Sequence, residues 1–379
     1  MIQLCNRLKT NCWLNIPYGA NDDFVLQLAT LAYNSIRKDV RVYIEYTNEA
    51  WNSFFNSGKY CESMGIKLNM STDPLTARNL FYSKRSKQII TIWKNVFKTQ
   101  DSQLVLVLAS FTVMPDVSTR ILSYDSAYKA HSSVMLAVTG YFDCGNLNPT
   151  VVANSNLSYI FAGCNASLPG AQDVLGKHSA IAKSFNVSLG MYESGSSVME
   201  PAAIYTGYET PGATDKFIAA NRDPQMYTVY KNYYGMFNRF NLAENCHYGY
   251  VGIPTKYGSW SLLEYQTQNV STAPKYQAVW DLISSAQILA NSTTKAPVVS
   301  LTSTSKPVQI INSATTTTKT TTKPSTTTLK PTTTTAKPTT KPTTTVKPTT
   351  TTVKATTTTS KPTTTTPKIT TSSRTTKKV

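Results

Sequence analysis

The chain has 379 residues, a formal net charge of +17 at pH 7 and an abrupt change of composition near Asn291. All five Trp, all six Cys and every Asp and Glu precede that residue. Fourteen of the 37 Lys and Arg lie in the segment after it, so 23 basic residues face 20 acidic ones in the remainder. The remainder is nearly neutral, and its basic residues do not cluster with aromatic ones. This pattern argues against a nucleic-acid-binding protein.

The composition predicts two parts, a folded domain over residues 1–291 and a disordered tail over residues 292–379. The tail is rich in Thr, Lys and Pro and has too few apolar side chains to offset the entropy of ordering its backbone. Thr-rich segments with spaced Pro residues are typical of O-glycosylated stalks. The Lys residues of this stalk would contact an acidic surface or matrix, or keep the stalk solvated.

Several asparagines begin N-x-S/T sequons, and their number exceeds what a cytosolic domain is expected to carry. They are Asn69, Asn156, Asn165, Asn186, Asn269 and Asn291. We therefore expect a secreted, monomeric glycoprotein without a membrane span. The chain does not begin with a signal peptide, and we expect that segment to have been lost with the N-terminal part of the fold.

The six Cys residues allow up to three disulfides in fifteen pairings, and their spacing does not indicate zinc. Proximity along one strand-to-helix loop suggests Cys144 with Cys164. The three His residues share no short ligand spacing, so we expect neither a metal nor an organic cofactor.

Six short apolar runs predict strands, and longer segments with helical spacing lie between them. The strands are expected at Trp13–Ile16, Val42–Tyr46, Leu104–Ala109, Val134–Val138, Ser188–Tyr192 and, less clearly, Tyr248–Val251. The helices are expected at Asp22–Ser35, Pro74–Phe97, Ala171–Phe185, Pro224–Asn238 and Pro274–Leu289. Runs such as LVLVLA are apolar at successive positions, which is typical of a parallel sheet covered on both faces. The alternation restricts the fold to a doubly wound sheet or a barrel.

The most informative stretch is VYIEYTNEAWN, residues 42–52. A buried strand runs directly into Asn48, Glu49 and Trp51, so a carboxyl group lies at the carboxyl end of the strand, where a parallel barrel keeps its active site. Glu45 alternates to the opposite face of its strand, which favours a structural role.

A second strand, in LGMYESGSS, delivers Glu193 at its carboxyl end. Two Glu residues at equivalent ends of separate strands are expected to point into one cavity. Glycoside cleavage needs such a pair, because one carboxyl group protonates the leaving oxygen while the other attacks the sugar. Carboxyl groups about 5 Å apart give retention of configuration through a covalent glycosyl-enzyme.

The two motifs resemble those of the clan A retaining glycoside hydrolases. In that clan the acid/base Glu follows an Asn at the end of strand four, as Glu49 follows Asn48, and the nucleophile ends strand seven, as Glu193 ends a strand three units later. Over roughly residues 1–290 the sequence is similar to secreted cellulase-like or cellulose-binding proteins. The similar segments include WLNIPYGANDDFV, AVTGYF and KYGSW.

The resemblance implies a (β/α)8 TIM barrel from which strands 1 and 2 are missing in this chain, together with an Arg that clan members carry near the nucleophile. We therefore expect a fragment that begins at an internal Met. The resemblance also implies that Asn48 bonds the sugar 2-hydroxyl, that Tyr141 orients Glu193 or lines the sugar site, and that Trp260 is the platform for a pyranose ring. Trp51 completes the expected substrate-binding residues.

The expected function is a retaining hydrolase of β-linked polysaccharide, of the cellulase or β-glucanase type. An alternative is a carbohydrate-binding or wall protein without turnover, and a further one is a mucin-like structural component. The site residues also have plain structural interpretations: Glu49 as a helix N-terminal acid, Glu193 as a loop acid beside a glycine, and Tyr141 and Trp260 as core or rim aromatics.

Overall fold

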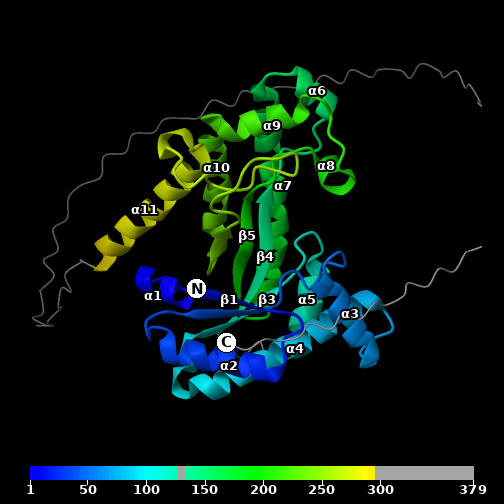
Figure 1. Cartoon of the computed structure of the whole chain (residues 1–379), viewed down its shortest axis with the longest axis vertical. Coiled ribbons are helices and arrows are strands. Elements are labelled where there is room, and N and C mark those ends of the chain that lie inside the picture. The colour runs from blue at the N-terminus through cyan, green and yellow to red at the C-terminus, as the bar shows by residue number, and fades with distance from the viewer. Residues whose placement is uncertain (126–132, 295–379) are drawn as a thin grey trace, which may run out of the picture. The chain divides into compact units, whose positions relative to one another are not determined.

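A computed structural model of the chain describes residues 1–125 and 133–294, with side chains as far as residue 285 (Figure 1). The last helix continues to Thr294, and the rest of the predicted tail, residues 295–379, lies outside the described residues. In chain order the elements are α1 (Ile2–Leu8), β1 (Cys12–Ile16), α2 (Asp22–Ser35), β2 (Val42–Tyr46), α3 (Asn56–Lys67), α4 (Pro74–Phe97), β3 (Leu104–Ala109), α5 (Pro115–Ser123), β4 (Val134–Phe142), α6 (Pro149–Asn154), α7 (Leu157–Ser184), β5 (Ser188–Ser196), α8 (Pro201–Thr206), α9 (Ala213–Arg222), α10 (Gln225–Gly235), β6 (Asn245–His247) and α11 (Pro274–Thr294).

The described strands form a single six-stranded parallel sheet in the order β1-β2-β3-β4-β5-β6. Each strand neighbours the next one along the chain, so the order never reverses as it does in a doubly wound sheet. The twist of such a sheet curls it toward one face. The result is an α/β fold with a curled, half-barrel sheet.

The prediction of a (β/α)8 TIM barrel is wrong. Within residues 1–125 and 133–294 the sheet has six strands, with β1 and β6 at its two edges. Eight tilted strands are needed to close such a barrel. The curl nevertheless brings the starts of the two edge strands together, because Asn11 Nδ2 donates to Glu244 Oε1 at 2.6 Å. In a closed barrel, backbone hydrogen bonds would join the two edge strands, whereas here the contact between them is made by side chains.

The two faces of β3 explain its uninterrupted apolar sequence. Leu104, Leu106 and Leu108 pack into the main core between the sheet and the helices. The alternate residues of β3 join a small cluster on the inner face of the curl, which consists of Tyr43, Val105, Val107, Ala109, Met135, Ala137 and Tyr192, with Trp13 packed against it. Because side chains from β2, β3, β4 and β5 meet in this cluster, it fills the concave face.

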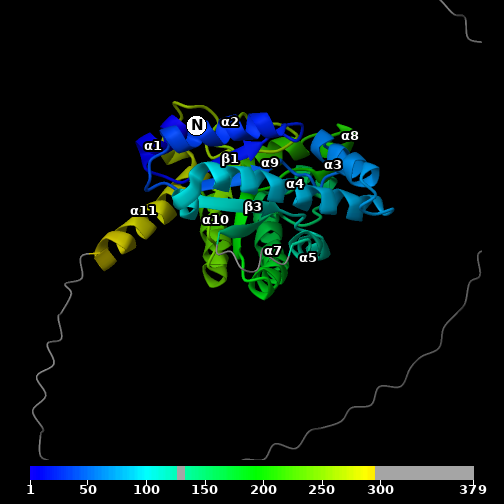
Figure 2. The same cartoon turned by 90° about the horizontal axis from the view of Figure 1, so that it is seen from below.

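The outer face is covered by helices whose ends match local sequence signals. Helix α2 begins after Asn21, whose side chain accepts a hydrogen bond from the Phe24 amide at 2.9 Å, and α4 begins after Asp73, which accepts from the Thr76 amide at 2.8 Å. Helix α4 packs against β2 and β3 and against α2. Helices α2 and α4 lie next to each other in both views (Figures 1 and 2).

Some predicted boundaries are wrong. The sixth strand spans Asn245–His247 rather than Tyr248–Val251. Helix α7 starts fourteen residues before the predicted Ala171, since Pro169 lies inside it and does not end it. Tertiary packing of α7 against β4, β5 and α5 overrides the local cost of that proline. None of the helices in the described part of the chain combines the length and apolar character needed to cross a bilayer.

The expected Cys144–Cys164 disulfide is confirmed. It links the loop after β4 to α7 and closes a loop with a sequence separation of 20 residues. Cys5, Cys12, Cys61 and Cys246 are free thiols. The bond therefore fixes the loop that follows the carboxyl end of β4.

Removal of this disulfide should lower the stability of the domain. A cross-link over a loop of this size contributes about 2–4 kcal/mol, mainly by restricting the unfolded chain. We expect Cys144→Ser combined with Cys164→Ser to lower the free energy of unfolding by about this amount in urea titrations. Cys246→Ser, which removes an unpaired thiol, is the control and should change stability much less.

Candidate active site

Glu49 lies in a turn directly after β2, with its backbone in the left-handed region at φ 44°. Non-glycine residues with positive φ are uncommon, and they cluster at functional sites where the surroundings hold them. Here the backbone N–H of Asn52 donates to the backbone carbonyl of Glu49 at 2.9 Å, and Ser57 Oγ donates to the backbone carbonyl of Asn48 at 2.7 Å. These two bonds hold the turn that carries Glu49.

Glu193 owes its position to an irregularity in β5. The register between β4 and β5 shifts so that Val138 pairs with Met191 and Thr139 with Glu193, which leaves Tyr192 as the extra residue. A β-bulge of this kind re-aims side chains and is common next to active sites. Tyr192 belongs to the inner cluster, and Glu193 also faces the curl, where it meets Tyr141.

The two carboxyl groups share one polar environment. Tyr141 Oη donates to Glu193 Oε2 at 3.0 Å. Asn52 Nδ2 donates to Glu49 Oε2 at 2.9 Å, and Tyr192 Oη lies 3.5 Å from Glu49 Oε1. Glu193 lies close enough to Glu49 for the charge of one to act on the other. The two residues are 144 positions apart in the sequence, and their use as a catalytic pair stays a prediction.

Burial raises the pKa values of both carboxyl groups. Burial raises the pKa of Glu193 to about 7, the charge of Glu49 adds to the shift, and the Tyr141 hydroxyl opposes it. Burial also raises the pKa of Glu49, against the hydrogen bonds from Asn52 and Tyr192. Interacting carboxyl groups titrate as a pair. A protonated and an ionised carboxyl group can therefore coexist in this site.

A third carboxyl group, that of Glu45, belongs to the same site. Its side chain is only 3% exposed, and Oε2 accepts a hydrogen bond from Trp13 Nε1 at 2.9 Å. Burial raises the pKa of Glu45 to about 7, with a contribution from the charges of Glu193 and Glu49. The prediction that Glu45 points away from the site is wrong, since alternation along β2 places Tyr43 and Glu45 together on the inner face.

Two groups of aromatic side chains flank the carboxyl groups. Trp51 stacks on Phe111 with ring centroids 4.2 Å apart, and its Nε1 donates to Tyr192 Oη at 3.1 Å. On the other side Trp260 packs edge-on against Tyr141 at 5.1 Å and against Tyr248 at 6.0 Å. The predicted Tyr141 and Trp260 are thus in contact with each other beside Glu193.

The loop before Trp260 is shaped to receive its indole ring. Trp260 Nε1 donates to the Tyr257 carbonyl at 2.9 Å. Gly258 has φ +129°, and a Cβ atom on it would overlap the Trp260 indole nitrogen. A glycine is therefore required at this point of the KYGSW motif.

Asn48 stands apart from the other predicted residues. Its side chain is exposed, and the amide that supports the Glu49 carboxyl group is that of Asn52. The sequence contains a signal for this contact, because residues 49 and 52 are one turn apart at the start of the segment after β2. Asn52 is the residue that sequence reasoning missed.

The histidines of the described chain have structural partners. His178 is buried between Ser118 Oγ at 2.9 Å and the Thr112 carbonyl at 2.8 Å, and His247 Nε2 lies 3.1 Å from Tyr230 Oη. The remaining His131 lies outside the described residues. Among the described residues, groups of three or more His, Cys, Asp or Glu arranged to hold a metal ion are absent.

Neither a comparison with models of known protein families nor a comparison with curated proteins gives a match for this chain. The chemistry of the site therefore has to be argued from its own residues.

Removing the Tyr141 hydroxyl should raise the pKa of Glu193 further above its present value of about 7, because that hydroxyl stabilises the carboxylate. The measurement is a carbon-13 NMR titration of glutamate carboxyl groups in Tyr141→Phe. Tyr192→Phe is the matched control and should raise the pKa of Glu49 instead. Equal Glu193 titrations in the parent and Tyr141→Phe would contradict the assigned hydrogen bond.

The buried Glu45 should make the folded state less stable as pH rises. Its pKa is about 7 in the folded protein against an ordinary value of 4.5, so between these pH values the folded state binds more protons than the unfolded state. The free energy of unfolding should therefore fall from pH 4.5 to 7. Glu45→Gln, which mimics the neutral acid, should show a smaller fall in urea titrations at both pH values, and a parallel fall in both proteins would contradict the buried site.

Proposed function

We propose that the protein is a retaining glycoside hydrolase that cleaves β-linked polysaccharide of the cellulose or β-glucan type. The single observation that carries the proposal is the pair formed by Glu49, in the turn after β2, and Glu193, in the second half of β5, where the charge of Glu49 acts on Glu193. Both are half-buried, so both keep access to a ligand. Displacement at a sugar carbon needs one carboxyl group protonated and the other ionised, and an interacting pair that titrates together can hold its protons in this way.

In the proposed reaction the Glu193 carboxylate attacks the anomeric carbon while Glu49 donates its proton to the glycosidic oxygen. The carbon–oxygen bond to the leaving sugar breaks, and a glycosyl ester on Glu193 forms. Glu49, now ionised, takes a proton from water, whose oxygen displaces Glu193 and restores the starting state. The Tyr141 hydroxyl supports Glu193 as an anion at the start and end of the cycle. The roles within the pair follow the Asn48–Glu49 motif.

The aromatic groups support a sugar substrate. Trp260, Tyr141 and Tyr248 form an aromatic cluster beside Glu193, and Tyr248 is 45% exposed. Rings of this kind stack on the apolar CH face of a pyranose while hydroxyl groups bond to its edges. Trp51 lies on the other side with its indole nitrogen already used by Tyr192, so its contribution is shape rather than hydrogen bonding.

The sequons support a secreted glycoprotein. The five acceptor asparagines whose side chains the structure describes are all exposed: Asn69, Asn156, Asn165, Asn186 and Asn269. The side chain of Asn291 lies outside that description. Exposure is what attachment of a bulky glycan requires. We propose an extracellular location, with a polysaccharide as the partner of the folded domain.

One observation favours a second function, that of a carbohydrate-binding protein without turnover. Among the described residues, neither Glu49 nor Glu193 takes part in an ion pair. A nearby cation would lower the pKa of a nucleophile and keep it ionised. Without one, Glu193 has a pKa of about 7 and is protonated over more of the acidic range. The aromatic cluster would bind sugar in either case.

The deciding experiment is hydrolysis of soluble β-glucans by the full chain, with Glu49→Gln and Glu193→Gln as variants. Loss of either carboxyl group should lower the rate by about 10²- to 10⁴-fold. Glu209→Gln, which changes an exposed carboxyl group that accepts a hydrogen bond from Thr214, should hydrolyse like the parent. A 2-deoxy-2-fluoroglycoside with a good leaving group should label Glu193, and proton NMR of the first product should show the retained anomer.

Binding of β-glucan by the parent without sugar release, unchanged in Glu193→Gln, would establish the carbohydrate-binding function instead. Equal hydrolysis by parent and Glu193→Gln would refute Glu193 as the nucleophile, and labelling of Glu49 would reverse the two roles.

A further inference from the structure

Lys275 is a buried lysine in the first turn of α11, one residue after Pro274. Its side chain is 6% exposed, although an ammonium group loses much hydration energy when it leaves water. Burial lowers its pKa to about 7, and the charge of Glu264 opposes this shift. The carboxylate of Glu264 is itself held by Arg222 through two bonds of 2.6 and 2.9 Å. Among the residues that the structure describes, Lys275 therefore forms no ion pair with an acidic side chain.

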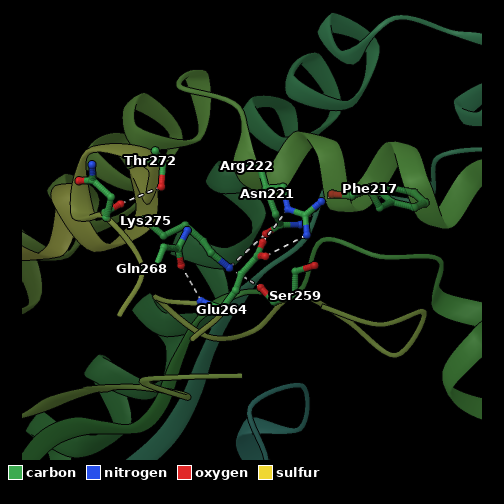
Figure 3. Close-up of polar contacts among 9 residues, drawn as sticks. Phe217, Asn221, Arg222, Ser259, Glu264, Gln268, Thr272 and Lys275 are labelled. Atoms are coloured by element: carbon green, nitrogen blue, oxygen red, sulfur yellow. Dashed lines mark hydrogen bonds and ion pairs between the residues drawn. The ribbon is translucent and has the colours of Figure 1, made fainter. Parts of the chain in front are cut away.

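The Lys275 amine instead joins two segments that lead to the candidate active site. Figure 3 shows Lys275 reaching from α11 toward Asn221 and Ser259. Its Nζ donates to the backbone carbonyl of Ser259 and to Asn221 Oδ1, the latter at 3.3 Å. Ser259 belongs to the loop after β6, and Asn221 lies in the last turn of α9. One side chain thus holds three elements together.

The bond to Ser259 acts directly before the aromatic platform. Ser259 immediately precedes Trp260, and its neighbour Gly258 approaches the Trp260 indole too closely for any side chain. The indole packs edge-on against Tyr141, which in turn donates to Glu193. A fixed carbonyl at residue 259 therefore limits the directions that the Trp260 ring can take.

The bond to Asn221 leads to the end of β5. Asn221 Oδ1 also accepts from Ser196 Oγ at 3.4 Å, and Tyr230 Oη donates to the same Ser196 hydroxyl at 3.0 Å. Ser196 lies three residues after Glu193 on the same strand. Lys275 is consequently linked to the surroundings of Glu193 by two routes. One runs through Asn221 to the end of β5, and the other runs through the Trp260 loop.

We propose that Lys275 is a positioning residue that holds the Trp260 platform in place beside Glu193, by fixing the Ser259 carbonyl to α11. As a step in sugar binding this rests on the proposed function, but the placement of Trp260 can be tested without it. A long side chain with several donors can reach from α11 to both acceptors, whereas an apolar one would leave the Ser259 carbonyl without its donor. The cost of burying the ammonium group is offset by this placement.

The test is nitrogen-15 NMR of the tryptophan indole groups, of which the chain has five. Trp260→Phe identifies the Trp260 resonance. Lys275→Met should shift or broaden that resonance and leave the resonance of the core residue Trp93 in place, whereas Lys231→Met, on the neighbouring helix α10, should leave both unchanged. Replacing a buried charge by an apolar side chain of similar length is compatible with folding.

A second measurement uses Glu193→Gln as its background, because Glu193, which Tyr141 connects to Trp260, also has a pKa of about 7. In that background the Trp260 resonance should still move with a midpoint near pH 7, where the Lys275 amine loses its proton. The other ionisable groups around the amine are Arg222 and Glu264, which pair with each other, and His247, whose pKa is lowered by burial to about 4. The titration covers pH 6 to 8, about one unit on either side of the midpoint. The proposal would be overturned if the Trp260 resonance responded neither to Lys275→Met nor to pH in this range.

The consequence for sugar binding is measured with β-glucan oligosaccharides. Loss of an ordered aromatic contact is expected to weaken binding by roughly two- to tenfold. In Lys275→Met the KM should rise by that factor while kcat changes less than about twofold, because the carboxyl pair is intact. Unchanged affinity despite a displaced Trp260 resonance would also overturn the role in binding. Absence of both binding and hydrolysis in the parent would refute the proposed function, while the NMR result would still decide the placement of Trp260.

Discussion

The curl of the parallel sheet is the constraint on which the candidate site depends. Strands β2 and β5 are not neighbours, since β3 and β4 lie between them. In a flat sheet the intervening strands would separate them by about 14 Å, at roughly 4.8 Å per strand. The curl shortens the path across the concave face, so that Trp51 after β2 bonds to Tyr192 on β5. The same curl brings Asn11 to Glu244 at the opposite end of the strands.

The electrostatics of the site follow from what fills this concave face. An apolar cluster occupies it below the carboxyl groups, so Glu45, Glu49 and Glu193 lose water and act on one another. Each of the three has a raised pKa, with burial as the largest cause. Gathering like charges in this way costs stability, and a protein that needed only a stable core would gain by replacing them. The arrangement makes physical sense where a proton has to be transferred near neutral pH.

The sequence predicted the parts of the fold whose signals are local. LVLVLA predicts a strand covered on both faces, and the helices predicted from Asp22 and Pro74 begin at those residues. The six strands were predicted, but the barrel to which they were assigned was predicted wrongly, because its closure was inferred from a resemblance and depends on contacts between distant segments. Asn11 with Glu244 is such a contact, and neither residue carries a local signal for it.

The candidate site shows the same division. Glu49 and Glu193 could be found because each follows an apolar run, and Tyr141 and Trp260 because their motifs could be compared with known ones. Glu45 was placed on the wrong side, since strict alternation says which residues share a face but not which face is concave. The bulge at Tyr192 was equally hidden, because it shows only in the register of β5 against β4.

The burial of Lys275 could not be predicted from the sequence either. A lysine after a proline at the start of a helix is an ordinary surface pattern, and its hydrogen-bond partners lie 16 and 54 residues away. Only the packing of α11 against α9 and the Trp260 loop reveals that the amine is enclosed. The β-bulge at Tyr192 and the amine of Lys275 act on different parts of one site. The bulge sets the direction of Glu193 from within the sheet, and Lys275 holds the Trp260 platform from outside the sheet. Under the proposed function, such a site can lose sugar affinity without losing its carboxyl pair, so that binding and chemistry are separable.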